Sequence, residues 1–431
     1  MDELKGIEHL KGLLARKAQR VETRYKYYDM KNSLKYFHGL IPASMRWMTS
    51  SLGWCGKTVD TLADRLSFRT FDNDNFNLNA IFDMNNKDIL FDSAILSALI
   101  ASCSFIYISR QEDGFPKLEV IDGANATGII DSTTNLLKEG YAVLDRGENN
   151  IPTLEAYFVP GKTTYYVNGN EAFSEEYNCD YPLLVPIIFR PEAKRPFGHS
   201  RITRALMDYC ESARRTLLRS EVASEFYSHP QKYALGMSQE AEDWDKWQMT
   251  ISAFLRFDKD EDGDRPTVGQ FSQQSMSPFI EQMKMYASLA VGETGLTMDD
   301  LGFNTVNPSS AEAIKASHET LRLVARKAQK TFGVGFLNAG FLAACVRDNV
   351  AYNRSVFYMT KCRWYPIFEP DTSAVSLIGD AVIKMSQSLG DIVDAKLVED
   401  MTGWDLGATS PTTLEQIEAE EVTTEESEVN G

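Results

Sequence analysis

The feature that most constrains this fold is a long helical pattern that begins at Asn307-Pro308-Ser309-Ser310-Ala311-Glu312 and continues unbroken to Phe332. Pro308 precedes the predicted helix, Ser309 can cap its free amides, and Glu312 can reach back to the Ser309 amide. One face then carries the residues expected to pack inward: Ile314, His318, Leu321, Ala325, Ala328 and Phe332. The pattern predicts a helix of about 24 residues, or roughly 36 Å. That length suits a strut in a large assembly.

Length and charge set further limits on the chain. At 431 residues it should form about two to four subregions. Hydrophobic residues make up 43% of it, which is enough to bury substantial cores. The net charge of −17 argues against an outer surface that grips nucleic acid through basic patches. It is compatible with a surface along which DNA slides.

Cysteine usage and hydropathy narrow the class of protein. Six cysteines are scattered without a CxxC spacing, so we expect neither a zinc site nor structural disulfides: Cys55, Cys103, Cys179, Cys210, Cys345 and Cys362. Residues 1–17 are charged and amphipathic, unlike a signal peptide. The longest apolar run, residues 333–345, is too short to span a membrane. We interpret it as a buried continuation of the long helix.

The chain alternates between helical and β-rich regions. Helices are predicted at residues 10–28, 52–66, 82–100, 201–228, 241–254, 278–291, 374–389 and 394–401. Period-two alternation predicts a β-rich subdomain over 104–190, with strands at 104–109, 117–121, 141–145, 153–159, 163–167 and 184–189. A further strand is predicted at 267–271 and a β-like segment at 355–368. From Ala408 onward the chain has seven glutamates and no lysine or arginine, so this acidic tail is expected to be disordered.

Two short motifs resemble ligand-binding loops but are incomplete. Gly56-Lys57-Thr58 matches the end of a phosphate-binding loop, yet Ser51 stands where that loop needs its first glycine. We interpret the motif as the first turn of a helix. Asp258, Asp260 and Asp262 match half of a calcium loop, but Gly269 replaces its bidentate glutamate. We interpret this segment as a solvated acidic turn, with weak binding of a divalent ion left open.

No constellation of residues indicates catalysis. The five histidines show no metal-ligand spacing, and the nucleophile-elbow pattern GxSxG is absent from the sequence. The cluster Asp243-Trp244-Asp245-Lys246-Trp247 is more typical of a contact surface than of an active site. We therefore predict no catalytic residue, no metal site, no cofactor and no enzymatic activity.

These segments together resemble the portal proteins of tailed bacteriophages, of the siphovirus head-to-tail connector type. The resemblance runs from about residue 24 to residue 406. Its main elements are Val59-Asp60-Thr61-Leu62-Ala63-Asp64-Arg65-Leu66, Gly198-His199-Ser200-Arg201-Ile202, the long helix after Asn307, and the segment that starts at Trp364-Tyr365-Pro366. The chain departs from the family at Ser102, where relatives often have glycine, and between residues 177 and 184, which are compressed.

The resemblance implies an α+β portal fold with wing, stem, clip and crown regions that assembles into a ring. The implied regions are a wing at 1–199, stem helix 1 at 200–228, a clip at 229–276, stem helix 2 at 277–295, a tunnel loop at 296–308, a long wing helix with returning strands at 309–368, a crown at 369–407 and the acidic tail at 408–431.

The family also implies a function and its residues. A ring, usually of twelve subunits, would form a channel for double-stranded DNA at one vertex of the capsid. The implied partners are the terminase large subunit, a head–tail adaptor, and the major capsid and scaffold proteins, with no membrane. The implied location is the virion, and the host cytoplasm during assembly.

The implied site residues fall into three groups. They are the tunnel loop Phe303, Asn304, Thr305, Val306 and Asn307, the channel-lining stem residues Lys284 and Arg214, and the clip docking residues Trp244, Trp247, Asp258, Asp260 and Asp262. Two other functions stay open. One is a different head-completion protein without a long DNA-lining stem, and the other is a nucleotide-dependent enzyme built around Lys57.

Overall fold

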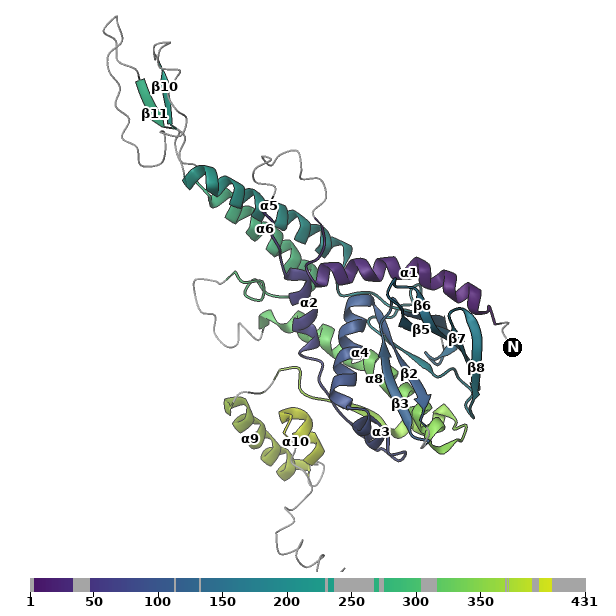
Figure 1. Ribbon diagram of the computed structural model, residues 1–431. Coiled ribbons are helices and arrows are strands. Elements are labelled where there is room, and N and C mark those ends of the chain that lie inside the picture. Colours follow the sequence, from purple (N-terminus) through teal and green to yellow (C-terminus); the bar gives the residue numbers. More distant parts are fainter. Residues whose placement is uncertain are drawn as a thin grey trace, which may run out of the picture.

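The computed structural model describes residues 4–33, 47–111, 114–131, 133–228, 232–235, 267–270, 275–303, 316–368, 370, 372–389 and 395–404. Figure 1 shows a body of sheets and helices from which one pair of helices projects. The predicted mixture of helix and sheet is confirmed.

The N-terminal part of the body is helical, as predicted. It contains α1 (Ile7–Tyr28), α2 (Trp54–Ala63), α3 (Leu78–Met84) and α4 (Lys87–Ala101). The prediction of one helix over 82–100 is wrong, because Asn86 adopts a left-handed conformation with φ 53°. The Asn85 side chain stabilises the break: it donates to the Ile81 and Pro116 carbonyls and accepts the Leu118 amide. A helical hydrophobic pattern alone does not reveal such a turn.

Two antiparallel sheets form the β-rich subdomain. The three-stranded sheet has the order β3-β2-β9, from β2 (Cys103–Arg110), β3 (Pro116–Ile121) and β9 (Leu184–Ile188). The five-stranded sheet is a meander of β4 (Ala126–Ile130), β5 (Leu137–Arg146), β6 (Pro152–Val159), β7 (Lys162–Val167) and β8 (Asn170–Glu176). All six predicted strands are confirmed. Strands β4 and β8 were not predicted, and β8 is exposed throughout, so it lacks the alternation that marks a half-buried strand.

Helix α8 (Glu319–Asp348) runs through the core, and the predicted buried continuation over 333–345 is confirmed. It packs against β9, where a Cβ on Gly335 would lie 2.7 Å from Ile187 Cδ1. The prediction of an unbroken helix through His318 is wrong, because His318 is a turn residue that precedes the first residue of α8. The predicted cap at Ser309 and Glu312 lies outside the described residues.

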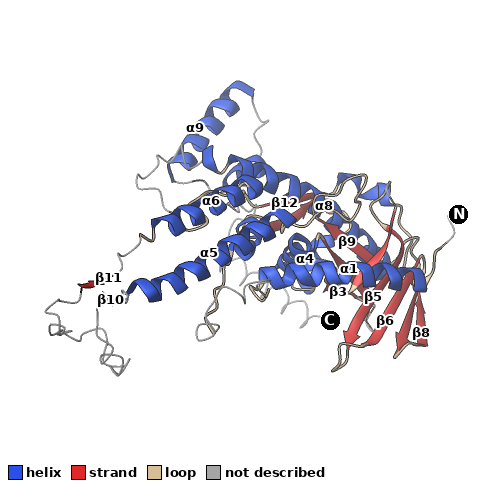
Figure 2. Cartoon of the chain, turned by 90° about the horizontal axis from the view of Figure 1, so that it is seen from above, coloured by secondary structure: helices blue, strands red, loops and turns tan. Residues whose placement is uncertain are grey.

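The chain then returns across the body. The 3₁₀ helix η3 (Arg354–Met359) occupies the start of the predicted β-like segment, and only β12 (Lys361–Trp364) is a strand there. Strand β12 pairs with β1 (Phe68–Asp72), which joins the N-terminal helical region to the segment that follows α8. Two helices follow at the predicted places, α9 (Thr372–Leu389) and α10 (Ala395–Thr402). Figure 2 shows α9 apart from the sheets.

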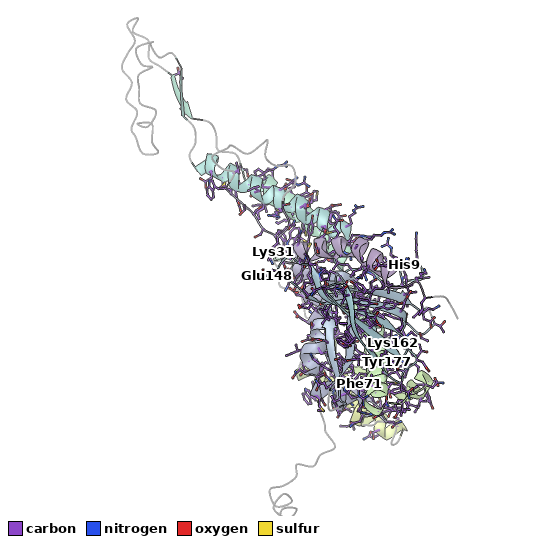
Figure 3. The ribbon with its side chains drawn as sticks, turned by 45° about the vertical axis from the view of Figure 1, so that its right-hand side comes forward. His9, Lys31, Phe71, Glu148, Lys162 and Tyr177 are labelled. Carbon is purple, nitrogen blue, oxygen red and sulfur yellow. The ribbon has the colours of Figure 1, made fainter. Side chains whose placement is uncertain are left out.

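The projecting pair consists of α5 (Arg204–Ser228) and α6 (Ser277–Thr294). Beyond them lies a small antiparallel ribbon of β10 (Lys232–Leu235) and β11 (Thr267–Gln270). Strand β11 lies at the strand predicted for 267–271, whereas β10 was not predicted. The predicted helix at 241–254 lies outside the described residues. Figure 3 shows the side chains of the body gathered below this pair, with Lys31 near its base.

Ser102 allows a test of the fold at a position where the portal proteins that this chain resembles often have glycine. Its φ is 92°, a conformation that favours glycine, and it ends α4 by donating its amide to the Ala98 carbonyl. We predict that Ser102→Gly raises the free energy of unfolding by about 1 kcal/mol, because glycine removes the strain. The adjacent Ala101→Gly is the control and should lower it by about 1 kcal/mol. Denaturant titration measures both, and a destabilising Ser102→Gly would contradict the prediction.

Candidate channel and docking surfaces

Small side chains hold the two projecting helices together. Ala213 of α5 and Ala287 and Ala290 of α6 are all buried. Side chains of this size allow two helix backbones to approach closely. On the outer face of α6, Ile280, Met285 and Leu289 are half exposed, which leaves an apolar surface available to another chain.

A buried arginine fixes the base of this pair to the body. Arg201, just before α5, is 5% exposed. Its guanidinium donates to the Thr294 carbonyl at the end of α6, at 2.5 Å, and to the Thr58 carbonyl of α2, at 3.5 Å. Burial lowers the pKa of Arg201 to about 10. The C-terminal end of a helix also favours a cation, so the charge lies where the helix dipole stabilises it.

The two predicted channel-lining residues lie in different surroundings. The Arg214 guanidinium donates to the Ser50 and Asn32 carbonyls, which belong to segments flanking the N-terminal helices. These hydrogen bonds hold its guanidinium within its own chain, and its place in a channel stays a prediction. Lys284 is exposed on α6. Its place in a channel stays a prediction.

Of the predicted tunnel loop at 296–308, the structure describes residues 296–303. The Phe303 amide donates to the Met298 carbonyl at 3.0 Å, and its ring packs edge-on against Trp54 with centroids 6.3 Å apart. Phe303 thus packs against Trp54 at the start of the predicted loop, and its contact with DNA stays a prediction. The neighbouring aromatic ring offers burial that a loop tip does not. Asn304, Thr305, Val306 and Asn307 lie outside the described residues.

The predicted clip contacts also lie outside the described residues. These are Trp244, Trp247, Asp258, Asp260 and Asp262. The acidic turn with its calcium-loop half-motif belongs to the same segment. Their roles stay predictions.

Gly56-Lys57-Thr58 forms the first turns of α2, in agreement with the simpler interpretation. The Thr58 hydroxyl is buried and donates to the Trp54 carbonyl at 2.7 Å. A Cβ on Gly56 would lie 3.2 Å from the Tyr28 carbonyl, so the end of α1 covers this helix start. A phosphate-binding loop needs open amides here, and α1 occupies that space.

Two further findings concern the described residues alone. Within them, no three His, Cys, Asp or Glu side chains gather closely enough to hold a metal ion. Among the helices of those same residues, none combines the length and the apolar character that a bilayer crossing needs.

Sequence spacing did not predict that four of the cysteines form two pairs of contacting thiols. The Cys55 and Cys210 sulfurs lie 3.3 Å apart and are buried between α2 and α5. A side-chain hydrogen bond also joins Cys345 to Cys179, and this contact together with burial raises the pKa of the Cys345 thiol. All six cysteines are free thiols. The members of each pair are more than 150 residues apart, so only the fold brings them together.

The comparisons with known proteins point to one class, the portal proteins of tailed bacteriophages. No family model matches the chain. The portal protein of Mycobacterium phage L5 is 25% identical over 327 residues, which cover 71% of this chain and 67% of the relative. The portal protein of Mycobacterium phage D29 is 24% identical over 345 residues, covering 75% and 71%. The predicted resemblance to tailed-phage portal proteins is thereby confirmed.

Two solved structures of a gene transfer agent particle also align with the chain. One is its virion, with 12% identity, and the other its neck computed with C12 symmetry, with 11% identity. They cover 80% and 81% of this chain and 89% of theirs. Both have a TM-score of 0.43, which is too low to define a shared fold.

The base of the projecting pair gives the prediction of this section. Arg201→Ala should lower the free energy of unfolding by about 3 kcal/mol, because it leaves a cavity and two buried carbonyls without their donor. Arg204→Ala, an exposed residue at the start of α5, is the matched control and should change it by less than about 0.5 kcal/mol. Thermal or denaturant unfolding measures both. Equal effects of the two variants would contradict the anchoring role.

Proposed function

We propose that this chain is a portal protein, whose copies form a ring around a channel for double-stranded DNA. The observation that carries the proposal is the similarity to two portal proteins over 71% and 75% of the chain. The projecting α5–α6 pair supports it, because a long helical pair is the kind of element that can line a channel. In this proposal the pair is the stem, and β10 and β11 belong to the clip.

The charge of the stem fits DNA that passes without being held. Helices α5 and α6 carry five basic and six acidic side chains. A strongly basic channel would neutralise phosphates and bind DNA with salt-dependent strength. A balanced surface neither binds the backbone strongly nor repels it strongly, so it allows sliding.

The partners and the location follow from the same proposal. Twelve copies would form the ring at one vertex of the capsid, so the protein would reside in the virion. The clip would contact the terminase large subunit during packaging and a head–tail adaptor afterwards. The wing would contact the major capsid and scaffold proteins. The protein itself would be structural, with the terminase supplying the energy of packaging.

Assembly tests this function. Mass photometry of the purified protein at micromolar concentration should show a closed oligomer of about twelve times the chain mass of 48.5 kDa. A second preparation at tenfold lower concentration controls for nonspecific association, because a closed ring keeps its mass on dilution. A stable monomer would contradict the proposal.

Lys284 tests the channel more directly. In a ring of twelve, Lys284→Glu would exchange about twelve positive charges for twelve negative ones at one level of the channel. We predict normal rings but less DNase-protected DNA per procapsid at low salt, with the deficit shrinking as salt screens the charges. Lys284→Gln is the control and should show a smaller deficit. Equal packaging by all three proteins at every salt concentration would place Lys284 outside the channel.

A further inference from the structure

A groove runs along the exposed side of α8, between this helix and residues 361–368. It consists of two adjoining hollows of about 370 and 520 Å³, which share Arg326, Gln329, Cys362 and Trp364. Val334, Leu337 and Trp364 line it with apolar surface, and Val334 is 43% exposed. Exposed apolar surface in a groove suits a peptide with apolar side chains.

The rim of this groove is basic, although the chain as a whole is strongly acidic. Arg326, Lys330 and Lys361 are exposed, and none of them forms an ion pair with another described residue. Arg322, one turn earlier, pairs with Glu319 at 2.7 Å. Among the described residues that line the two hollows there is no carboxylate. Cations gathered without counter-charges attract an acidic ligand.

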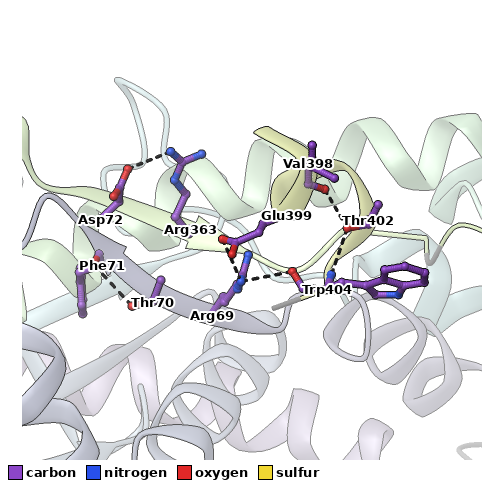
Figure 4. A network of polar contacts seen from close by, with 9 residues as sticks. All are labelled: Arg69, Thr70, Phe71, Asp72, Arg363, Val398, Glu399, Thr402 and Trp404. Atoms are coloured by element: carbon purple, nitrogen blue, oxygen red, sulfur yellow. Dashed lines mark hydrogen bonds and ion pairs between the residues drawn. The ribbon is translucent and has the colours of Figure 1, made fainter. Parts of the chain in front are cut away.

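The C-terminal segment leaves the described structure beside this groove. Arg69 of β1 donates to the Glu399 carboxylate of α10 at 3.2 Å and to the Trp404 carbonyl at 3.5 Å (Figure 4). Trp404 and Tyr365 line a third hollow, of about 830 Å³. This hollow shares residues 365–368 with the groove. The chain beyond Trp404 therefore starts at the mouth of the groove.

The composition of that segment complements the groove. Residues 405–431 contain Asp405, seven glutamates and no basic residue. Leu414, Ile417 and Val422 are interspersed with the glutamates. An extended chain covers roughly 3.3 Å per residue, so the ten residues from Trp404 to Leu414 span up to about 33 Å. That reach is comparable with the length of the groove-forming part of α8.

We propose that the acidic C-terminal segment folds back onto this basic groove of its own chain. Its glutamates face Arg326, Lys330 and Lys361, and its apolar side chains lie on Val334 and Leu337. The segment then shields the basic patch from nucleic acid phosphates, which the same cations would otherwise attract. This contact is independent of ring formation, so it does not rest on the proposed function.

Zero-length carbodiimide cross-linking of the full chain tests the contact. We expect Lys330 and Lys361 to form amide cross-links to the glutamates at 415–421. Lys327, which is exposed on the same helix but does not line the groove, is the matched control and should cross-link less. Mixed ¹⁴N- and ¹⁵N-labelled protein distinguishes the source of the segment. Links within one label support the proposal, whereas mixed-label links, or equal linking to Lys327, would overturn it.

A DNA-binding measurement tests the shielding. In a full-length variant in which Glu415, Glu418, Glu420 and Glu421 are replaced by Gln, the apparent Kd for a short DNA duplex at low salt should fall about tenfold. Adding Lys330→Gln and Lys361→Gln to that variant should restore the weak binding. An unchanged Kd in the first variant, or no reversal in the second, would show that the segment does not cover the groove. Circular dichroism confirms that both variants are folded.

Discussion

The packing around Phe336 of α8 is the interaction on which the rest of this structure depends. This ring is fully buried. Its centroid lies 4.5 Å from the ring centroid of Phe91 in α4, 5.9 Å from that of Phe68 in β1 and 6.2 Å from that of Trp364 in β12. The four residues come from positions far apart in the chain. Burying an aromatic ring of this size stabilises the fold by about 2–3 kcal/mol, and its neighbours add aromatic contacts. One helix thereby orders both the N-terminal helices and the returning strand.

That core positions the functional parts at its edges. Arg201 fixes the α5–α6 pair to the body, because its guanidinium donates to the end of α6 and to a carbonyl of α2 at once. On the other side, the β1–β12 pair holds Arg69 and Arg363, and Arg363 pairs with Asp72 at 2.8 Å. Arg69 in turn fixes the end of α10. The α5–α6 pair and α10 are thus attached to the same core at different points.

Hydrophobic periodicity predicted most elements of this fold but not its local breaks. The pattern at residues 201–228 is a helix from Arg204 to Ser228, and the six strands predicted in the β-rich region are present. The turn at Asn85–Asn86 depends on side-chain hydrogen bonds to residues 31 or more positions away, which no local pattern contains. The surface strand β8 has no buried face to mark it.

The helices of the candidate site could be predicted from the sequence, but the contacts of its individual side chains could not. The sequence predicted α5 and α6, but not that Arg214 donates to neighbouring carbonyls or that Phe303 packs on Trp54. Both outcomes depend on tertiary contacts. The basic groove also depends on tertiary contacts, because Lys330 and Lys361 line one hollow only when β12 lies beside α8.

The central claim is that the α5–α6 pair lines a channel of DNA width in a closed ring. A cryo-electron microscopy reconstruction of the purified oligomer tests it most directly, since it locates this pair relative to the symmetry axis. The account predicts a ring whose central hole is bounded by α5 and α6, with Lys284 near the hole. A ring in which these helices point outward, or a particle without a central hole, would contradict it.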